Sequence, residues 1–319
     1  MATIFPWLGL HFCVAAVGTW WARRYAVARD LVDQPGERRS HVVATPRGGG
    51  IAIVVSLLLA SVWLAWLFPS QRVLLAVFVA GMLAVAAVGW WDDHRPLSPW
   101  SRLLVHALAG AGFSMALLYT TGSRGQAMFA FLAVLVLVNV WNFMDGIDGL
   151  AATQAAVCAV AFLFWLPGPW SWLAAALLAA CCGFLPFNFP RARIFLGDVG
   201  SGVLGFALAA LLSVSAIEQD GLVLMLIPMA AFLVDASFTL SSRILCGERW
   251  WTPHVSHVYQ RAARRFGHVS VTSMYWMFST VTLLLISLAS NARPGPEIWL
   301  VAWYALALAL WGWARKQLK

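Results

Sequence analysis

The chain has 319 residues, of which 61% are hydrophobic and only 11% are charged, and its formal net charge is +8. Soluble domains carry about a quarter charged residues, and a chain of this size has no core that could bury so much apolar surface. The composition therefore excludes an ordinary soluble globular protein and indicates that most of the chain is solvated by lipid.

Apolar runs of about 20 residues, the length that crosses a bilayer as a helix, recur along the whole chain. They predict a single integral-membrane domain over residues 1–319: an all-α polytopic membrane protein with about 11 transmembrane helices. Barrel strands would be shorter and would alternate in polarity. The predicted spans lie near 5–22, 48–68, 72–91, 100–120, 126–143, 150–166, 170–187, 200–217, 222–243, 273–290 and 297–314.

The distribution of charge predicts the direction of these spans. No positive charge precedes the first apolar run, whereas Arg23 and Arg24 follow it, which is the order expected for a first span with its N-terminus outside. With a periplasmic N-terminus and a cytoplasmic C-terminus, 18 of the 21 basic residues lie inside, and only Arg72, Arg124 and Arg293 lie outside. We therefore predict a multi-pass protein of the bacterial inner (cytoplasmic) membrane.

The acidic residues gather on the same predicted face. Ten of the 13 acids fall inside, in or beside cytoplasmic loops near 23–47, 92–99, 144–149, 188–199 and 244–272. We expect the active site at this cytoplasmic face. Its basic balance suits anionic lipid head groups and anionic soluble substrates, although it also simply follows from the predicted topology. No basic module interleaved with aromatic residues is present, so we expect no nucleic-acid partner.

The first motif whose side chains could take part in a reaction is Asp92-Asp93, at the end of the third predicted span. Neighbouring side chains on a helix end point about 100° apart, so that the two acids can serve two partners. One could accept a proton while the other holds a cation or orients a basic side chain. Alternatively, the pair is only a solvated helix end.

The second motif places Asn139, Asn142, Asp145 and Asp148 at a spacing of three residues at the end of the fifth span. This spacing predicts a polar ridge along one helix face. Amide and carboxylate oxygens are the ligands of a hard cation such as Mg²⁺, usually beside substrate phosphates. Turn formation is the simpler explanation, but four regularly spaced polar residues in an apolar segment favour a site.

The third motif is Asp198, which glycines at 197, 200 and 202 flank at the start of the eighth span. Backbone N–H groups at a helix N-terminus favour the binding of phosphate, so this segment predicts a site for a phosphate and a metal ion. Asp235 lies inside the ninth span, where an acid marks a functional site; an ion pair or a helix-to-helix hydrogen bond is the alternative. The loop that follows contains His254, His257 and Arg264, types of side chain that can neutralise a pyrophosphate; a solvated basic loop is the alternative.

Together these motifs resemble one family, the polyprenyl-phosphate N-acetylhexosamine-1-phosphate transferases (glycosyltransferase family 4). The resemblance extends from the Asp33-Gln-Pro-Gly segment, through Thr45-Pro46-Arg47, to His257. Its specific strings are NxxNFxDGxDGLA from Asn139 and FxGDxGS from Phe195, in the family's order. It implies an Mg²⁺-dependent enzyme, with Mn²⁺ as a substitute, whose partners are a UDP-N-acetylhexosamine, undecaprenyl phosphate and the lipid bilayer; a homodimer stays open.

The resemblance also implies roles for particular residues. Asp92 and Asp93 correspond to the family's acid pair, one of them the base toward the lipid phosphate, and Asn142 and Asp198 to its Mg²⁺ ligands. Asp148 and Phe195 resemble its uracil contacts, and Arg102 the basic residue that meets the pyrophosphate. The predicted catalytic residues are Asp92, Asp93, Asp145, Arg102, His254 and His257. The predicted substrate-binding residues are Asn139, Asp148, Phe195, Arg47, Asp235 and Arg264.

The implied reaction is attack of a lipid phosphate oxygen on the β-phosphorus of a UDP-sugar, with UMP leaving and cationic Arg102 and His254 offsetting charge. The loop reads PHVSHVYQR rather than a dense histidine cluster, which favours the O-antigen-initiating subgroup over the muramoyl-pentapeptide enzymes. Pro96 departs from the longer acidic strings of many members, which puts a third acid there in doubt. The alternative function is a polytopic transporter or lipid flippase, in which Asp235 and the ridge at 139–148 would be intramembrane sites.

Overall fold

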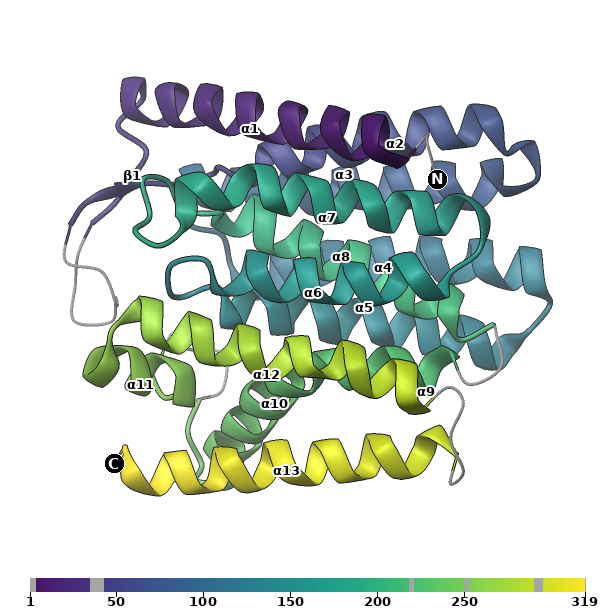
Figure 1. Cartoon of the computed structure of the whole chain (residues 1–319). Helices are drawn as coiled ribbons and strands as arrows, with labels where there is room; N and C mark the ends of the chain where they lie inside the picture. Colours follow the sequence, from purple (N-terminus) through teal and green to yellow (C-terminus); the bar gives the residue numbers. More distant parts are fainter. Residues whose placement is uncertain are drawn as a thin grey trace.

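The structure is a computed structural model that describes residues 4–34, 43–217, 221–249, 252, 254–289 and 295–318. Long helices run roughly side by side, and the chain begins at one end of the bundle and finishes at the other (Figure 1). The Asp33 to His41 stretch of the predicted motif lies partly outside the described residues, as do the acids at 218 and 220 and the arginine at 293.

A helix or a continuous helical stretch occupies each of the predicted spans. The long elements are α1 (Ile4–Ala28), α2 (Ile51–Leu67), α3 (Arg72–His94), α4 (Pro99–Thr121), α5 (Arg124–Met144), α6 (Leu150–Trp165), α7 (Gly168–Asn188), α8 (Gly197–Ser215), α12 (His268–Ala289) and α13 (Pro296–Gln317). The ninth span is formed by α9 (Gly221–Leu226), η2 (Ile227–Met229) and α10 (Ala230–Leu245) in succession.

Within the described residues, nine helical stretches are long and apolar enough to cross a membrane, while Ile51–Leu67 and Leu150–Trp165 are shorter apolar helices. The chain is therefore an all-α polytopic membrane protein. The crossing of all eleven spans and their direction stay predictions.

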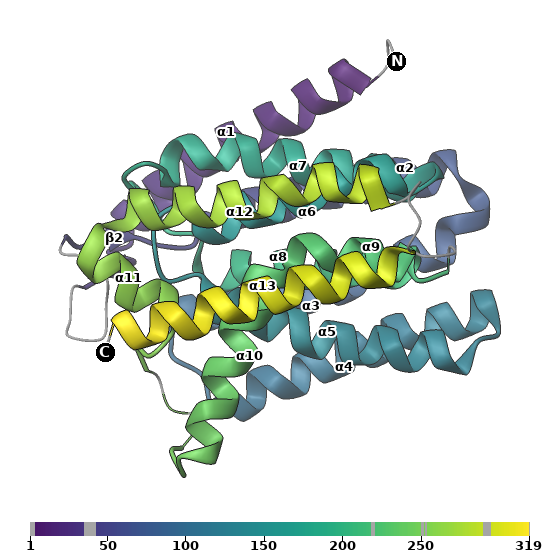
Figure 2. The ribbon, with the colours of Figure 1, turned by 60° about the horizontal axis from the view of Figure 1, so that its bottom comes forward.

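The centre of the bundle is α8, whose residues from Val199 to Ser215 are all buried. It packs between α3 and α5, and the figures place it in the middle of the helices (Figures 1 and 2). The small side chains and glycines of α8 allow this close approach. A Cβ added at Gly50 would lie 2.2 Å from the Cα of Gly200, so the start of α2 meets α8 backbone to backbone.

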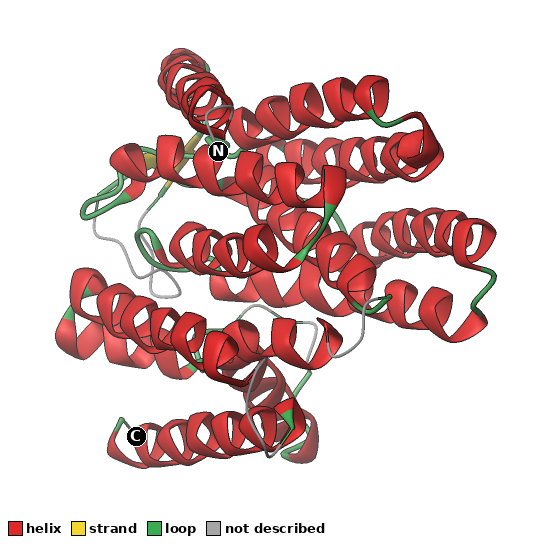
Figure 3. Ribbon diagram, turned by 45° about the vertical axis from the view of Figure 1, so that its right-hand side comes forward, coloured by secondary structure: helices red, strands yellow, loops and turns green. Residues whose placement is uncertain are grey.

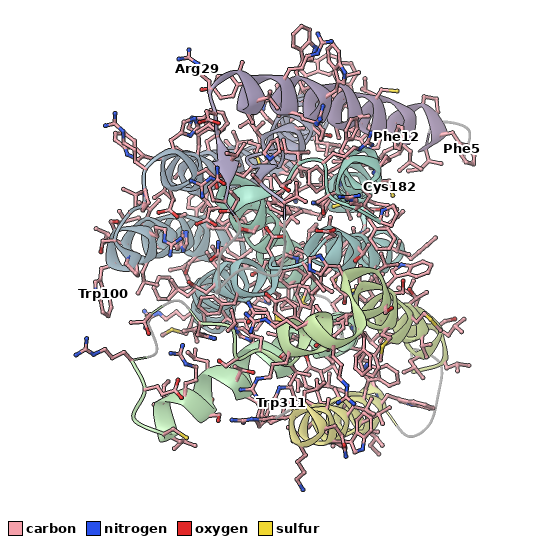
Figure 4. All side chains as sticks on the ribbon, turned by 90° about the vertical axis from the view of Figure 1, so that its left-hand side faces the viewer. Phe5, Phe12, Arg29, Trp100, Cys182 and Trp311 are labelled. Carbon is pink, nitrogen blue, oxygen red and sulfur yellow. The ribbon has the colours of Figure 1, made fainter. Side chains whose placement is uncertain are left out.

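The outside of the bundle is apolar. Phe5 is 73% exposed and Trp100 is 57% exposed, and both project away from the ribbon, as Phe12 does (Figure 4). A water-soluble protein rarely exposes such continuous apolar surface, whereas a lipid-facing surface requires it.

Some predicted loops contain regular structure. α1 continues to Ala28, so residues 23–28 are helical and not loop. Strands β1 (Val32–Asp33) and β2 (Thr45–Pro46) pair antiparallel, the only sheet among the described residues (Figure 3). The predicted loop at 244–272 contains the short helix α11 (Val258–Phe266) and the first turn of α12. The reason is amphipathicity: α11 buries Val258, Tyr259 and Ala263 and leaves its arginines outward.

Candidate active site

The acid at the end of α3 caps the start of α8. The Asp93 carboxylate accepts hydrogen bonds from the backbone amides of Asp198, at 3.1 Å, and Val199, at 3.2 Å. The first amides of a helix have no partner within it, and a carboxylate both bonds to them and offsets their positive partial charge. Asp93 is only 4% exposed. Its geometry is that of a residue which fixes the position of Asp198.

Glycine at position 89 makes this junction possible. A Cβ there would lie 2.5 Å from the carbonyl oxygen of Asp198 and 2.6 Å from the amide nitrogen of Val199. The end of α3 therefore touches the backbone of α8, and only a residue without a side chain fits.

Arg102 joins the acids of two helices. From the first turn of α4, its guanidinium lies 2.9 Å from Oδ2 of Asp92 and 2.5 Å from Oδ2 of Asp198. The other oxygen of Asp92 accepts a hydrogen bond from the Leu97 amide at 2.6 Å. The cation predicted to meet the pyrophosphate is thus held between two predicted catalytic or metal-binding acids.

The two predicted metal ligands lie side by side. The side-chain amide of Asn142 donates to Oδ1 of Asp198 at 3.1 Å and to the Ser201 hydroxyl at 3.2 Å. One turn further, Asp145 ends α5 and accepts no hydrogen bond from any described residue. Burial raises the pKa of Asp145 well above its ordinary value, and repulsion from Asp198 and Asp93 raises it further.

The donor set of this cluster fits a hard divalent cation. The acids at 92, 93, 145 and 198 outnumber the guanidinium groups of Arg102 and of Arg47, which interacts electrostatically with Asp93. If all four acids were ionised, the half-buried excess of two negative charges would be costly without a cation, and the raised pKa of Asp145 reflects that cost. No group of three or more His, Cys, Asp or Glu side chains able to share an ion occurs in the described part of the chain. Mg²⁺ does not need such a group of three side chains, because it keeps several bound waters and is usually held by one or two carboxylates together with substrate phosphates.

The two predicted uracil contacts belong to adjoining segments. Asp148 follows α5, and its Oδ2 accepts a hydrogen bond from the Ala192 amide at 3.2 Å, three residues before Phe195. Asn188 ties the same segments together, because its side chain accepts from the Gly149 amide and donates to the Ile194 carbonyl, both at 2.9 Å. The turn at 145–149 and the segment at 189–196 thus form one unit.

The histidine loop lies against the end of α5. The His257 ring is buried and stacks near Phe143, with ring centroids 6.2 Å apart, and His254 lies 4.9 Å from His257. Burial lowers the pKa of His254 to about 4, and the neighbouring His257 and Arg243 act in the same direction. Burial beside other basic groups therefore disfavours a proton on this ring in the protein alone, and the cationic role of His254 toward the pyrophosphate stays a prediction.

Asp235 organises the helices under this loop. It is 1% exposed and accepts five hydrogen bonds from other residues of the chain. Two come from the first amides of α11, at Val258 and Tyr259, each at 3.0 Å. Nδ1 of His257 lies 3.8 Å from Asp235, beyond hydrogen-bonding distance. Asp235 thus caps α11; its direct contact with substrate stays a prediction.

Three predicted residues stand apart from these bonds. The Asn139 side-chain amide donates to the Leu135 carbonyl, one turn earlier in the same helix, at 2.7 Å. This hydrogen bond is therefore made within α5 and not to the acids of the site. Arg264 is exposed on α11, and the Nε of Arg47 is buried without a hydrogen-bond partner among the described residues. Their roles in substrate binding stay predictions.

Several residues that the sequence did not single out support the site. The Tyr259 hydroxyl donates to the Phe143 carbonyl at 2.8 Å, and His268 lies 3.2 Å from Asp148. Ser201 belongs to the FxGDxGS string and Asn188 to the segment before it, so spacing could have indicated them. Tyr259 lies in the PHVSHVYQR loop, but its spacing did not mark it as a site residue, and His268 belongs to no quoted string. Only the packing of α11 and α12 shows where these two side chains lie.

Comparison with known proteins identifies the family of the chain. Residues 75–216, which include the acid pair, the ridge and the Asp198 segment, match the model of Glycosyl transferase family 4. A decaprenyl-phosphate N-acetylglucosaminephosphotransferase of Mycobacterium leprae is 30% identical over 90% of this chain and 82% of its own length.

Two further relatives have related names. An undecaprenyl-phosphate alpha-N-acetylglucosaminyl 1-phosphate transferase of Thermotoga maritima is 28% identical over 82% of both chains. A phospho-N-acetylmuramoyl-pentapeptide-transferase of Synechococcus sp. is 34% identical over 59% of this chain and 61% of its own length. The chain therefore belongs to glycosyl transferase family 4, the polyprenyl-phosphate N-acetylhexosamine-1-phosphate transferases.

Proposed function

We propose that this enzyme transfers N-acetylhexosamine-1-phosphate from a UDP-sugar to undecaprenyl phosphate or a similar polyprenyl phosphate, releasing UMP. The observation that supports this most is the meeting of Asp92, Arg102, Asn142 and Asp145 around Asp198, where acids, an amide and a cation from four helices come together. Relatives whose names contain N-acetylglucosamine make UDP-GlcNAc the first donor to test.

The proposed reaction is an in-line displacement at the β-phosphorus. A lipid phosphate oxygen attacks that phosphorus, the bond to the bridging oxygen of UMP breaks, and the electron pair leaves with UMP. The anomeric carbon–oxygen bond is untouched, so the configuration of the sugar is retained. Arg102 offsets charge on the phosphates as the two anions approach.

The residues divide this work by their geometry. Both oxygens of Asp93 accept hydrogen bonds from backbone amides of α8, and Asp93 is only 4% exposed. One oxygen of Asp92 is instead bonded to the Arg102 side chain, and the Asp92 side chain is 15% exposed. We therefore assign proton acceptance from the lipid phosphate to Asp92 and a positioning role to Asp93. Asp198 and Asn142 would hold Mg²⁺, which when bound supplies a positive charge to the diphosphate.

The product fits the first membrane step of an envelope polysaccharide, either O-antigen or another cell-envelope polymer. The expected location is the inner (cytoplasmic) membrane of a bacterium, and the assembly to test is a monomer against a homodimer. Sedimentation of the detergent-solubilised protein would separate the two.

The test is UMP release by purified, detergent-solubilised protein given undecaprenyl phosphate and UDP-GlcNAc, with Mg²⁺ or with EDTA. We expect release that requires both the lipid and Mg²⁺, and its loss in Asp198→Asn. Asp30→Asn is the matched control, because Asp30 is an exposed acid at the end of α1 outside the cluster. No release from folded protein with any UDP-sugar would refute the proposal and favour the transporter or flippase alternative.

A further inference from the structure

The first residue of α12 contacts a predicted nucleotide-binding acid. Nδ1 of His268 lies 3.2 Å from Oδ1 of Asp148, and the two side chains are 17% and 13% exposed. The residues are 120 positions apart, so the packing of α12 against α6 and the turn at 145–149 brings them together. The catalytic assignments above give His268 no task.

The hydrogen on Nδ1 determines what this contact does. Nδ1 also lies 3.4 Å from the backbone amide of Asp148, and could accept from it only as a bare nitrogen. A bare Nδ1 would then direct its lone pair toward a carboxylate oxygen at the shorter distance of 3.2 Å, which is repulsive. The Nδ1–H form instead donates to the carboxylate, and bonds to charged acceptors are the stronger ones. The Nδ1–H form gives up the bond from the Asp148 amide and makes His268 a donor to the carboxylate, and the role inferred for His268 rests on this form.

Other bonds fix the same residue from two sides. The Thr272 hydroxyl, one turn along α12, donates to the backbone carbonyl of Asp148 at 2.7 Å. The Ala192 amide donates to Oδ2 of Asp148 at 3.2 Å, from the segment that leads to Phe195. Asp148 is thus held at three atoms, and His268 is the only one of these partners that is a side chain bonded to the carboxylate itself.

We propose that His268 is a positioning residue that orients the Asp148 carboxylate toward the nucleotide base of the donor. This rests on the proposed function and on the role of Asp148 and Phe195 as uracil contacts, which the family resemblance implies. The uracil N3–H is a hydrogen-bond donor, and a carboxylate whose rotation is fixed accepts it without losing side-chain freedom on binding. His268 itself stays out of contact with the reacting phosphates.

The proposal makes a specific prediction for substitutions. His268→Ala should weaken UMP binding by up to roughly ten-fold, the size expected when a side chain that was already fixed must instead be immobilised on binding. His268→Asn should retain most of the affinity, because an Asn side-chain nitrogen can take the place of Nδ1. Thr272→Val removes the backbone bond but not the carboxylate bond, and is the matched control for loosening of α12.

The experiment is calorimetric titration of the full-length, detergent-solubilised protein and its variants with UMP, followed by steady-state kinetics. We expect His268→Ala to raise KM for UDP-GlcNAc while leaving kcat and KM for undecaprenyl phosphate unchanged. In an Asp148→Asn background, His268→Ala should add little further loss, because the pair acts as one unit.

The outcomes are distinguishable. Wild-type protein that binds no UMP would overturn the proposed function and this inference with it. Normal UMP binding by wild type and by His268→Ala would overturn the inference alone. So would Asn behaving like Ala, Thr272→Val losing as much affinity as His268→Ala, or full additivity with Asp148→Asn.

Discussion

A methyl group added at Gly89 should disable catalysis without touching a catalytic side chain. The Cβ of Gly89→Ala would lie 2.5 Å from the Asp198 carbonyl oxygen, about 0.9 Å short of the 3.4 Å at which ordinary van der Waals contact begins. Backbone atoms surround it, so helices α3 and α8 must separate by a distance of this order. The Asp93 bonds to α8, now 3.1 and 3.2 Å long, would then exceed hydrogen-bonding distance.

The expected loss is large in rate and moderate in stability. A displacement of about 1 Å at a reacting group costs roughly 100-fold in rate, and overpacking costs about 1–3 kcal/mol of folding free energy. We expect kcat for UMP release to fall roughly 100-fold in Gly89→Ala, while the protein still purifies as a folded membrane protein with a modestly lower melting temperature.

The matched control is Gly112→Ala, within α4. A Cβ there meets no atom closer than the Val77 Cγ1 at 3.9 Å, so the same glycine-to-alanine change introduces no clash. It should keep wild-type kcat. Wild-type kcat in Gly89→Ala would refute the reasoning, because it would mean that the α3–α8 junction does not set the position of Asp198.

Three further perturbations test other parts of the site. Arg102→Lys should lower kcat roughly 10- to 100-fold, because an ammonium cannot bridge Asp92 and Asp198 as a planar guanidinium does; an unchanged kcat would contradict that bridge. Asp235→Asn puts an NH₂ donor in place of a carboxylate oxygen that accepts two hydrogen bonds. The change should lower the free energy of unfolding by about 3 kcal/mol and lower the melting temperature; a wild-type melting curve would argue against the cap. Because the pKa of His254 is about 4 when folded, against 6.5 ordinarily, the unfolded chain gains a proton first as pH falls through this window. Stability should therefore fall between pH 6.5 and 4, and less steeply in His254→Gln; equal slopes in thermal denaturation would count against a buried neutral ring.

The positions of the helices could be predicted from the sequence because run length alone determines them in a lipid solvent. Each predicted span matches a helical stretch to within a few residues. Composition did not reveal the amphipathic α11, because its apolar residues are too few to form an apolar run. The helix becomes recognisable only in the structure, where Asp235 caps its first turn.

The contents of the site were predictable where residues are close in sequence or in a recognised string. Asp92, Asn142 and Asp198 were expected in one site. The structure brings them together, because Arg102 bridges the two acids and the Asn142 side-chain amide donates to Asp198. Charge state was less predictable: His254 was expected to be cationic, but burial and its basic neighbours disfavour a proton. A one-dimensional pattern contains no measure of burial.

Long-range partners were the least predictable part. His268 reaches Asp148 across 120 positions, and Tyr259 reaches Phe143 across 116. No periodicity connects such residues, because their contact depends on how α11 and α12 dock beside α5 and α6.

The most direct test of the central claim follows the β-phosphate of the donor. UDP-GlcNAc labelled with ³²P at the β-phosphorus is incubated with the purified protein, undecaprenyl phosphate and Mg²⁺, and the lipid is extracted. Transfer of a sugar-1-phosphate predicts that the label moves into the organic phase in step with the release of unlabelled UMP. Label that remains in the aqueous phase would contradict the account, either in UDP, if the sugar alone is transferred, or in unreacted UDP-GlcNAc.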